Sequence, residues 1–245
     1  MLLPKILDKA SKAGLSLLIS LSLLSSCKNT GSLSSPDNLI TAQGLIPGVD
    51  LGSPFELPHP NPGSFQWGVS TAGYQSEGSY GNSIWHQWDL DGKTEHRNIK
   101  GVDFFNRYKE DLDLAKRMGV NSFRFSIEWS RIEPREGYFD PNGIQFYHNL
   151  LNAIRERGMT PLVTLVHFNY PQWLIDDLPG NKVGLENPEF IPYFLRFTEK
   201  VVREYGRDIR YWLTFNEPNI WVPGAYLVGA TPPGKHNPFA TLRAC

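Results

Sequence analysis

The chain has 245 residues, of which 40% are hydrophobic and 20% are charged, and its formal net charge is -1. This balance is typical of a globular protein of one or two domains. A pI of about 6.6 and the lack of a basic stripe argue against a nucleic-acid partner.

The N-terminal segment, residues 1–27, has the pattern of an export signal. Lysines precede an apolar stretch from Ala13 to Leu24 that is too short for a comfortable bilayer span. The closing sequence Leu-Ser-Ser-Cys resembles a bacterial lipobox, in which signal removal leaves an N-terminal cysteine that carries lipid. We therefore expect an exported bacterial lipoprotein, periplasmic or on the cell surface, anchored to a membrane through Cys27. The alternative is an ordinary signal, or a membrane-anchoring helix, that happens to end near a cysteine.

The next segment, residues 28–62, is rich in Ser, Gly, Pro and Asn and has no sustained hydrophobic period. Such a segment buries too little apolar area to offset the entropy lost on ordering, so a flexible tether is expected. Residues 63–245 are expected to form the folded domain. With Cys27 and Cys245 as the only cysteines, a structural disulfide is not expected.

The domain repeats one unit three times, in which an amphipathic helix ends at a glycine and an apolar strand follows. The three glycines are Gly119, Gly158 and Gly206. The expected strands are 66–70, 122–127, 162–166 and 210–215. This order predicts parallel strands joined by right-handed crossovers.

Polar residues follow each expected strand. They are Gln75 after the first strand, Arg124 and Glu128 on or after the second, His167 after the third, and Asn216 with Glu217 after the fourth. Functional residues at the C-terminal ends of successive strands are typical of a (β/α)8 barrel. A doubly wound nucleotide-binding fold would carry a glycine-rich turn after its first strand, and Gly73 and Gly78 lack that spacing. The expected fold is α/β, a TIM barrel of which about the first four βα units are present.

The sequence TFNEP at 214–218 places a carboxylic acid beside an amide at the exit of the fourth strand. Proline cannot donate to a sheet ladder, so Pro218 directs the backbone out of the sheet and holds Glu217 on the rim. A sugar-cleaving barrel places its proton donor at such a position.

Five segments together resemble one known family. They are 65–78 (FQWGVSTAGYQSEG), 83–85 (SIW), 107–111 (RYKED), 123–132 (FRFSIEWSRI) and 214–218 (TFNEP). They resemble glycoside hydrolase family 1, the β-glucosidase family, over roughly residues 65–238. The resemblance implies a TIM-barrel glycosidase of carbohydrate metabolism that hydrolyses O-glycosyl bonds with retention and needs no cofactor.

The resemblance also implies roles for five residues. Glu217 would be the general acid and base, and a retaining enzyme needs a second carboxylate, the nucleophile, about 5 Å away. Asn216 would bind the sugar 2-hydroxyl, and Gln75 and His167 would bind hydroxyls further round the ring. Arg124 would be the ion partner of the nucleophile. From the residues alone, a single histidine after a strand is more often a packing or capping residue.

Three further residues in these motifs, Glu77, Glu128 and Trp129, are expected to pack beneath the site. One departure from the family pattern is also clear, because the usual His-Trp-Asp-Leu-Pro becomes HFNYP at 167–171. This changes the wall beside the bound sugar, so the sugar preference follows less directly than the reaction. A metal site is not expected, because His86, His96, His148, His167 and His236 show no ligand spacing.

The sequence contains nothing like the Thr-Glu-Asn-Gly nucleophile motif that the family carries on its seventh strand. The expectation is therefore a truncated chain with little activity of its own, and self-association through the open half barrel. The substrate would be an unphosphorylated β-glycoside or oligosaccharide, because phospho-sugar members of the family work in the cytoplasm. The alternative is a lipid-anchored carbohydrate-binding or scaffold protein that has lost catalysis.

Overall fold

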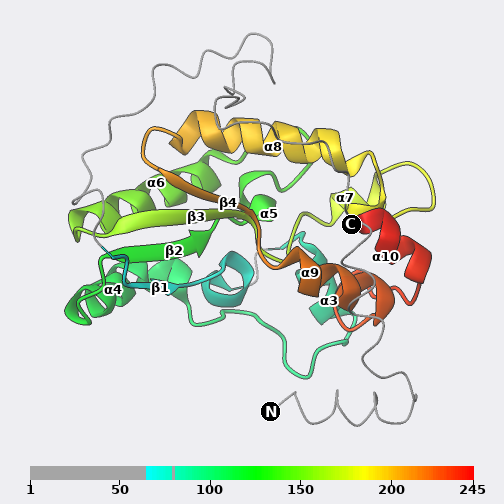
Figure 1. Ribbon diagram of the computed structural model, residues 1–245, viewed down its shortest axis with the longest axis horizontal. Helices are drawn as coiled ribbons and strands as arrows, with labels where there is room; N and C mark the ends of the chain where they lie inside the picture. Colours follow the sequence, from blue (N-terminus) through cyan, green and yellow to red (C-terminus); the bar gives the residue numbers. More distant parts are fainter. Residues whose placement is uncertain (1–64, 79–80) are drawn as a thin grey trace, which may run out of the picture. The chain divides into compact units, whose positions relative to one another are not determined.

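The computed structural model describes residues 65–78 and 81–245 (Figure 1). The predicted signal with Cys27 and the predicted tether at 28–62 lie outside these residues. Within the described ranges, no helix combines the length and the apolar character needed to cross a membrane.

A four-stranded parallel sheet forms the centre of the described part. Its strands are β1 (Gly68–Ser70), β2 (Ser122–Ser126), β3 (Thr160–Val166) and β4 (Tyr211–Phe215), paired in that order. All four predicted strands are confirmed, although β1 is shorter than expected. Because the strands are parallel, their C-terminal ends meet along one edge of the sheet, called the rim below.

Three long helices connect successive strands, as predicted. They are α4 (Phe104–Arg117), α6 (Pro141–Glu156) and α8 (Phe190–Tyr205). Figure 1 shows them arranged around the sheet in the same order as the strands that they connect. Helix α6 begins with Pro141 after Asp140, whose side chain accepts a hydrogen bond from Asn142 N at 2.9 Å. Its start is thus set by a proline and an acidic cap.

The predicted glycine stops are found at the ends of all three long helices. Gly119 and Gly158 have φ of 79° and 74°, in the left-handed region that ends a helix most easily at glycine. Gly206 caps α8 with φ of −58°, so it ends the helix without a left-handed turn. Gly206 instead packs tightly, because a Cβ there would lie 2.5 Å from the Val202 carbonyl oxygen.

Shorter helices lie between the strands and helices of the repeated unit. They are η3 (Gly73–Glu77), α3 (Ile84–Leu90), α5 (Trp129–Ile132), α7 (Trp173–Asp176), η4 (Gly184–Glu186), α9 (Pro218–Val222), η5 (Pro223–Leu227) and α10 (Pro238–Ala244). Among them, η3 and α9 directly follow the ends of β1 and β4. They carry two of the predicted site segments.

The core is formed where the central strands meet the helices. Leu150, Leu151 and Ile154 of α6 are completely buried, and the Trp129 ring stacks on Phe197 of α8 with centroids 4.5 Å apart. These large apolar side chains supply most of the burial that stabilises the fold.

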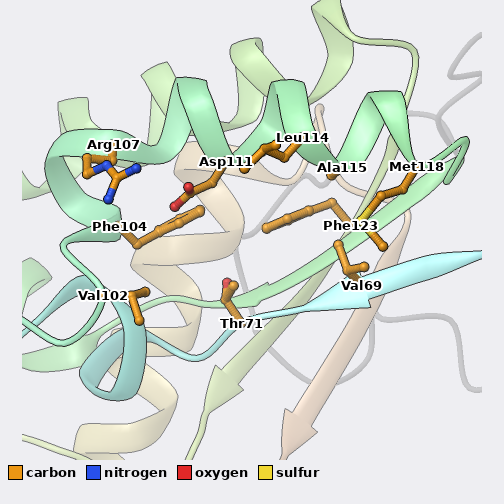
Figure 2. Close-up of a pocket in the computed structure, with 10 residues that line it drawn as sticks. All are labelled: Val69, Thr71, Val102, Phe104, Arg107, Asp111, Leu114, Ala115, Met118 and Phe123. Carbon is orange, nitrogen blue, oxygen red and sulfur yellow. The ribbon is translucent and has the colours of Figure 1, made fainter.

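Burial falls from the central strands to the edges of the sheet. Strands β2 and β3 are almost entirely buried, whereas Tyr211 on β4 is 41% exposed. At the other edge, a hollow of about 340 Å³ lies between β1 and α4, lined largely by apolar side chains that include the exposed Leu114 and Met118 (Figure 2). Neither β1 nor β4 has a second strand partner among the described residues. Such edges are open to pairing, and self-association through them stays a prediction.

Candidate active site

The predicted site residues are positioned by connections between neighbouring strand ends. Gly73 N at the start of η3 donates to Ser126 Oγ at the end of β2, over 2.7 Å. Asn216 N donates to the Val166 carbonyl at the end of β3, over 2.9 Å. The four segments that follow the strands therefore meet on one rim, as expected for a barrel.

Arg124 links three strands beneath this rim. Its Nε donates to Thr164 Oγ1 on β3 at 3.0 Å, and its Nη2 donates to Asn216 Oδ1 at 2.7 Å. A guanidinium only donates, so Asn216 must present its oxygen to Arg124 and direct its Nδ2 donors elsewhere. No carboxylate in the described part of the chain forms an ion pair with Arg124. The arrangement leaves a positive charge and an oriented amide ready for a ligand or an acid.

His167 is half-buried after β3 and close to this charge. Burial, with a smaller contribution from the Arg124 charge, lowers the pKa of His167 to about 4. The ring is therefore neutral at physiological pH and can both donate and accept a hydrogen bond. Its Nδ1 is buried and has no hydrogen-bond partner among the described residues. A neutral imidazole of this kind is suited to an uncharged hydrogen-bonding partner such as a hydroxyl.

The segment after His167 has a strained backbone that is held by two hydrogen bonds from one residue, Trp85. Phe168 has a φ of 62°, which is unusual for a residue other than glycine. Trp85 of α3 donates from Nε1 to the Phe168 carbonyl at 2.8 Å and from its backbone N to Asn169 Oδ1 at 3.3 Å. Sequence reasoning included Trp85 in a motif but missed this role, and only the SIW motif pointed towards it.

A buried cluster of acids lies beneath the rim. Glu77 and Glu128 are 6% and 4% exposed, and Trp129 is also buried, as expected for residues that pack under the site. Glu77 accepts from Arg131 Nε at 3.0 Å and from Tyr147 Oη at 3.0 Å. Burial raises the pKa of Glu77 to about 7, Arg131 opposes this, and the Glu128 charge adds to it.

Glu217 lies where sequence reasoning placed it, between β4 and α9. Its backbone is left-handed, with φ of 41° and ψ of 55°, and its carbonyl accepts from Ile220 N and Trp221 N at 2.9 Å each. Pro218 then opens α9, so the rim position is rigid. Residue 217 is exposed, because no described segment covers it.

Gln75 is also exposed, in the turn of η3 after β1. The structure thus brings Arg124, His167 and Asn216 together and leaves Gln75 and Glu217 at the open surface of the same rim. Among residues 65–78 and 81–245, no group of three or more His, Cys, Asp or Glu side chains could hold a metal ion. The chemistry available at the rim is hydrogen bonding, a fixed positive charge and a carboxylic acid.

Comparison with known proteins assigns this arrangement to a family. The sequence model of glycosyl hydrolase family 1 matches residues 58–244. The chain belongs to this family. The resemblance inferred from the motifs is confirmed, and the parallel sheet is a partial (β/α)8 barrel of the family 1 type.

Several relatives illustrate the extent of the match. Beta-glucosidase 24 from Arabidopsis thaliana is 36% identical over 193 residues, 73% of this chain and 35% of the relative. Beta-glucosidase A from Thermotoga maritima is 34% identical over 192 residues, 75% of this chain and 42% of the relative. The chain thus spans well under half the length of these family 1 relatives.

Solved structures show the same fold. A beta-glycosidase from Pyrococcus horikoshii superimposes with a TM-score of 0.69 at 31% identity, covering 77% of this chain and 43% of that chain. A beta-glucosidase from Thermotoga maritima in complex with castanospermine superimposes with a TM-score of 0.68 at 32% identity, covering 75% and 43%.

The buried acid at Glu77 predicts a pH dependence of stability. Its pKa is raised from 4.5 to about 7 on folding, so the folded state holds a proton that the unfolded state has lost between these values. Protonated Glu77 therefore contributes its full share to the free energy of unfolding below pH 4.5. As the pH rises from 4.5 to 7, the free energy of unfolding should fall by an amount on the order of 3 kcal/mol. Urea unfolding of Glu77→Gln across this window should show a flatter dependence than the wild type. Glu156→Gln, at an exposed site, should keep the wild-type slope, and an unchanged slope in Glu77→Gln would contradict the assignment.

The left-handed backbone at Glu217 predicts that a glycine variant is more stable than an alanine variant at this position. A left-handed conformation costs a residue with a Cβ roughly 1–2 kcal/mol relative to glycine. Glu217→Gly should therefore be about 1 kcal/mol more stable than Glu217→Ala by denaturant unfolding. At Glu110, exposed within α4, the order should reverse, with alanine more stable by about 1 kcal/mol. Equal stabilities at position 217 would show that the backbone there is not left-handed in solution.

Proposed function

We propose that the rim forms the sugar-binding and proton-handling part of a retaining glycosidase site that acts on β-glycosides. Glu217 protonates the departing glycosidic oxygen and later activates water, while a second carboxylate forms the glycosyl ester. Asn216 binds the sugar 2-hydroxyl, and Gln75 and His167 bind hydroxyls further round the ring. Arg124 pairs with the nucleophilic carboxylate.

The observation that carries this proposal is the orientation of Asn216. Its oxygen is held by Arg124 at 2.7 Å, so its two donors are directed by the protein before any ligand arrives. A donor fixed in place binds the 2-hydroxyl without reorganisation during the reaction, and hydrogen bonds to this hydroxyl strengthen in the transition state. The neutral state of His167 supports the same use, because an uncharged ring suits an uncharged hydroxyl.

A second function is sugar binding without hydrolysis at the same rim. Asn216 has directed donors and His167 has a buried Nδ1 without a hydrogen-bond partner among the described residues, and neither group needs a second carboxylate to bind a hydroxyl. Under this alternative the rim would retain affinity for sugars and lack turnover.

The N-terminal sequence supports an exported, lipid-anchored protein, and this bears on the substrate. Sugars phosphorylated during uptake are found inside the cell, so an exported enzyme would act on unphosphorylated β-glycosides or oligosaccharides. The basis is the apolar stretch before Leu-Ser-Ser-Cys at 24–27.

Ligand binding and turnover test the function. The full chain should bind castanospermine, the compound in the Thermotoga maritima structure, by calorimetry. Asn216→Ala should weaken binding roughly tenfold, the value of one or two hydrogen bonds, while Asn149→Ala on the exposed side of α6 should not. Any release of aryl alcohol from an aryl β-glucoside should be lost in Glu217→Gln. Binding without turnover would favour the alternative, and equal binding by the two asparagine variants would contradict both functions.

Fractionation tests the anchor. Expressed in a bacterial host, the full chain should be recovered with membranes, and Cys27→Ser should release it because the lipid-carrying thiol is gone. Cys245→Ser provides the matched control and should stay with the membranes. Membrane recovery of the Cys27→Ser variant would show that the segment is not a lipoprotein signal.

A further inference from the structure

A continuous set of hydrogen bonds runs beneath the rim from η3 to the segment after β3. Tyr147 Oη contacts both carboxylate oxygens of Glu77, at 3.0 and 3.1 Å, and accepts from Glu128 N at 2.7 Å. Glu128 Oε1 in turn accepts from Asn169 Nδ2 at 3.0 Å. These four side chains, Glu77, Tyr147, Glu128 and Asn169, are called the buried relay below. All four are more than nine-tenths buried.

Each end of the buried relay lies two residues from a residue that we propose binds sugar hydroxyls. Glu77 is in the same five-residue turn as Gln75, and Asn169 follows His167 in the strained segment after β3. Gln75 follows β1 and His167 follows β3, so the two residues lie on different segments of the rim. The buried relay connects these segments by hydrogen bonds that pass through Tyr147 of α6 and Glu128 after β2.

The amide at Asn169 is fixed in orientation by its two partners. Its Oδ1 must accept, since Trp85 N can only donate, and its Nδ2 must donate, since a carboxylate oxygen of Glu128 can only accept. An aspartate here would place a third buried carboxyl group beside Glu77 and Glu128, which like-charge repulsion disfavours. The presence of asparagine at 169 is thus matched to the acid at 128.

Glu128 has one further partner that makes this match specific. Its Oε1 also accepts from Ser130 Oγ at 2.6 Å. The same oxygen receives Asn169 Nδ2, so a glutamine at 128 would have to place its nitrogen there, where its two hydrogens could reach an aspartate at 169 and the Ser130 hydroxyl, which can also accept. Exchanging acid and amide between positions 128 and 169 would therefore keep both side-chain contacts, with the Ser130 bond reversed and only the longer bond from Ser130 N, 3.4 Å, lost.

We propose that the buried relay positions Gln75 and His167 relative to each other, and that the Glu128–Asn169 pair is the connection through which it holds the His167 segment. This rests on the proposed function, because it concerns the same sugar-binding residues. The relay residues are positioning residues. They act on Gln75 and His167 by holding the backbone segments that carry these two side chains.

The first test separates positioning from stability with a matched pair of buried asparagines. Asn187, at the end of η4, is 3% exposed and donates to the carbonyls of Pro179 and Lys182, so Asn187→Ala should cost similar stability. Asn169→Ala should shift the His167 ring and Gln75 amide signals in NMR spectra of the full chain and weaken castanospermine binding at least tenfold. Asn187→Ala should leave those signals in place and change binding less than twofold. Similar shifts of both signals in the two variants would overturn the proposal.

The second test is the exchange of acid and amide. Asn169→Asp alone should shift the His167 and Gln75 signals at neutral pH, and the Glu128→Gln, Asn169→Asp double variant should restore them. A double variant no closer to wild type than Asn169→Asp would overturn the proposal even if Asn169→Ala does not fold. Failure of the wild-type chain to bind castanospermine would count against the proposed function, whereas the NMR signals still decide whether the relay positions the two residues.

Discussion

The guanidinium of Arg124 is the interaction on which the rest of the site depends. It starts on β2, donates to Thr164 on β3 and donates to Asn216 after β4, so one side chain links three strands at the rim. It fixes the orientation of the Asn216 amide and contributes to keeping His167 neutral. Its charge is held by the neutral oxygens of Thr164 and Asn216. We propose that the second carboxylate of the glycosidase site completes this arrangement as the ion partner of Arg124.

The rim carries the groups that contact a ligand, and the buried layer beneath it holds them in position. Three of the rim groups, Gln75, His167 and Glu217, are exposed or half-exposed. The layer beneath is buried and consists of acids, a tyrosine and an amide that hydrogen-bond to one another and to Arg131, Ser130 and Trp85. In buried surroundings each hydrogen bond is strong and the loss of a partner destabilises the fold, which makes the layer rigid. A rigid layer beneath the rim holds Gln75, His167 and Glu217 in place, although they lie on short, irregular segments.

Much of the fold and the residues of the site could be predicted from local sequence patterns. The hydrogen bonds that connect these residues across the fold could not. Apolar periodicity and glycine stops predicted the strands and long helices because both depend on neighbours in sequence, and the polar residues after each strand located the rim. The bonds from Trp85 to Asn169 and from Asn169 to Glu128 span 84 and 41 residues, so no local pattern contains them.

A crystal structure of the chain with castanospermine would show whether Arg124 orients Asn216 towards a ligand. We expect Asn216 to keep its oxygen on Arg124 and to donate from Nδ2 to a ligand hydroxyl, with the ligand ring between Glu217 and His167. A ligand bound away from the rim, or an Asn216 amide turned so that its oxygen no longer faces Arg124, would show that Arg124 does not organise a sugar site.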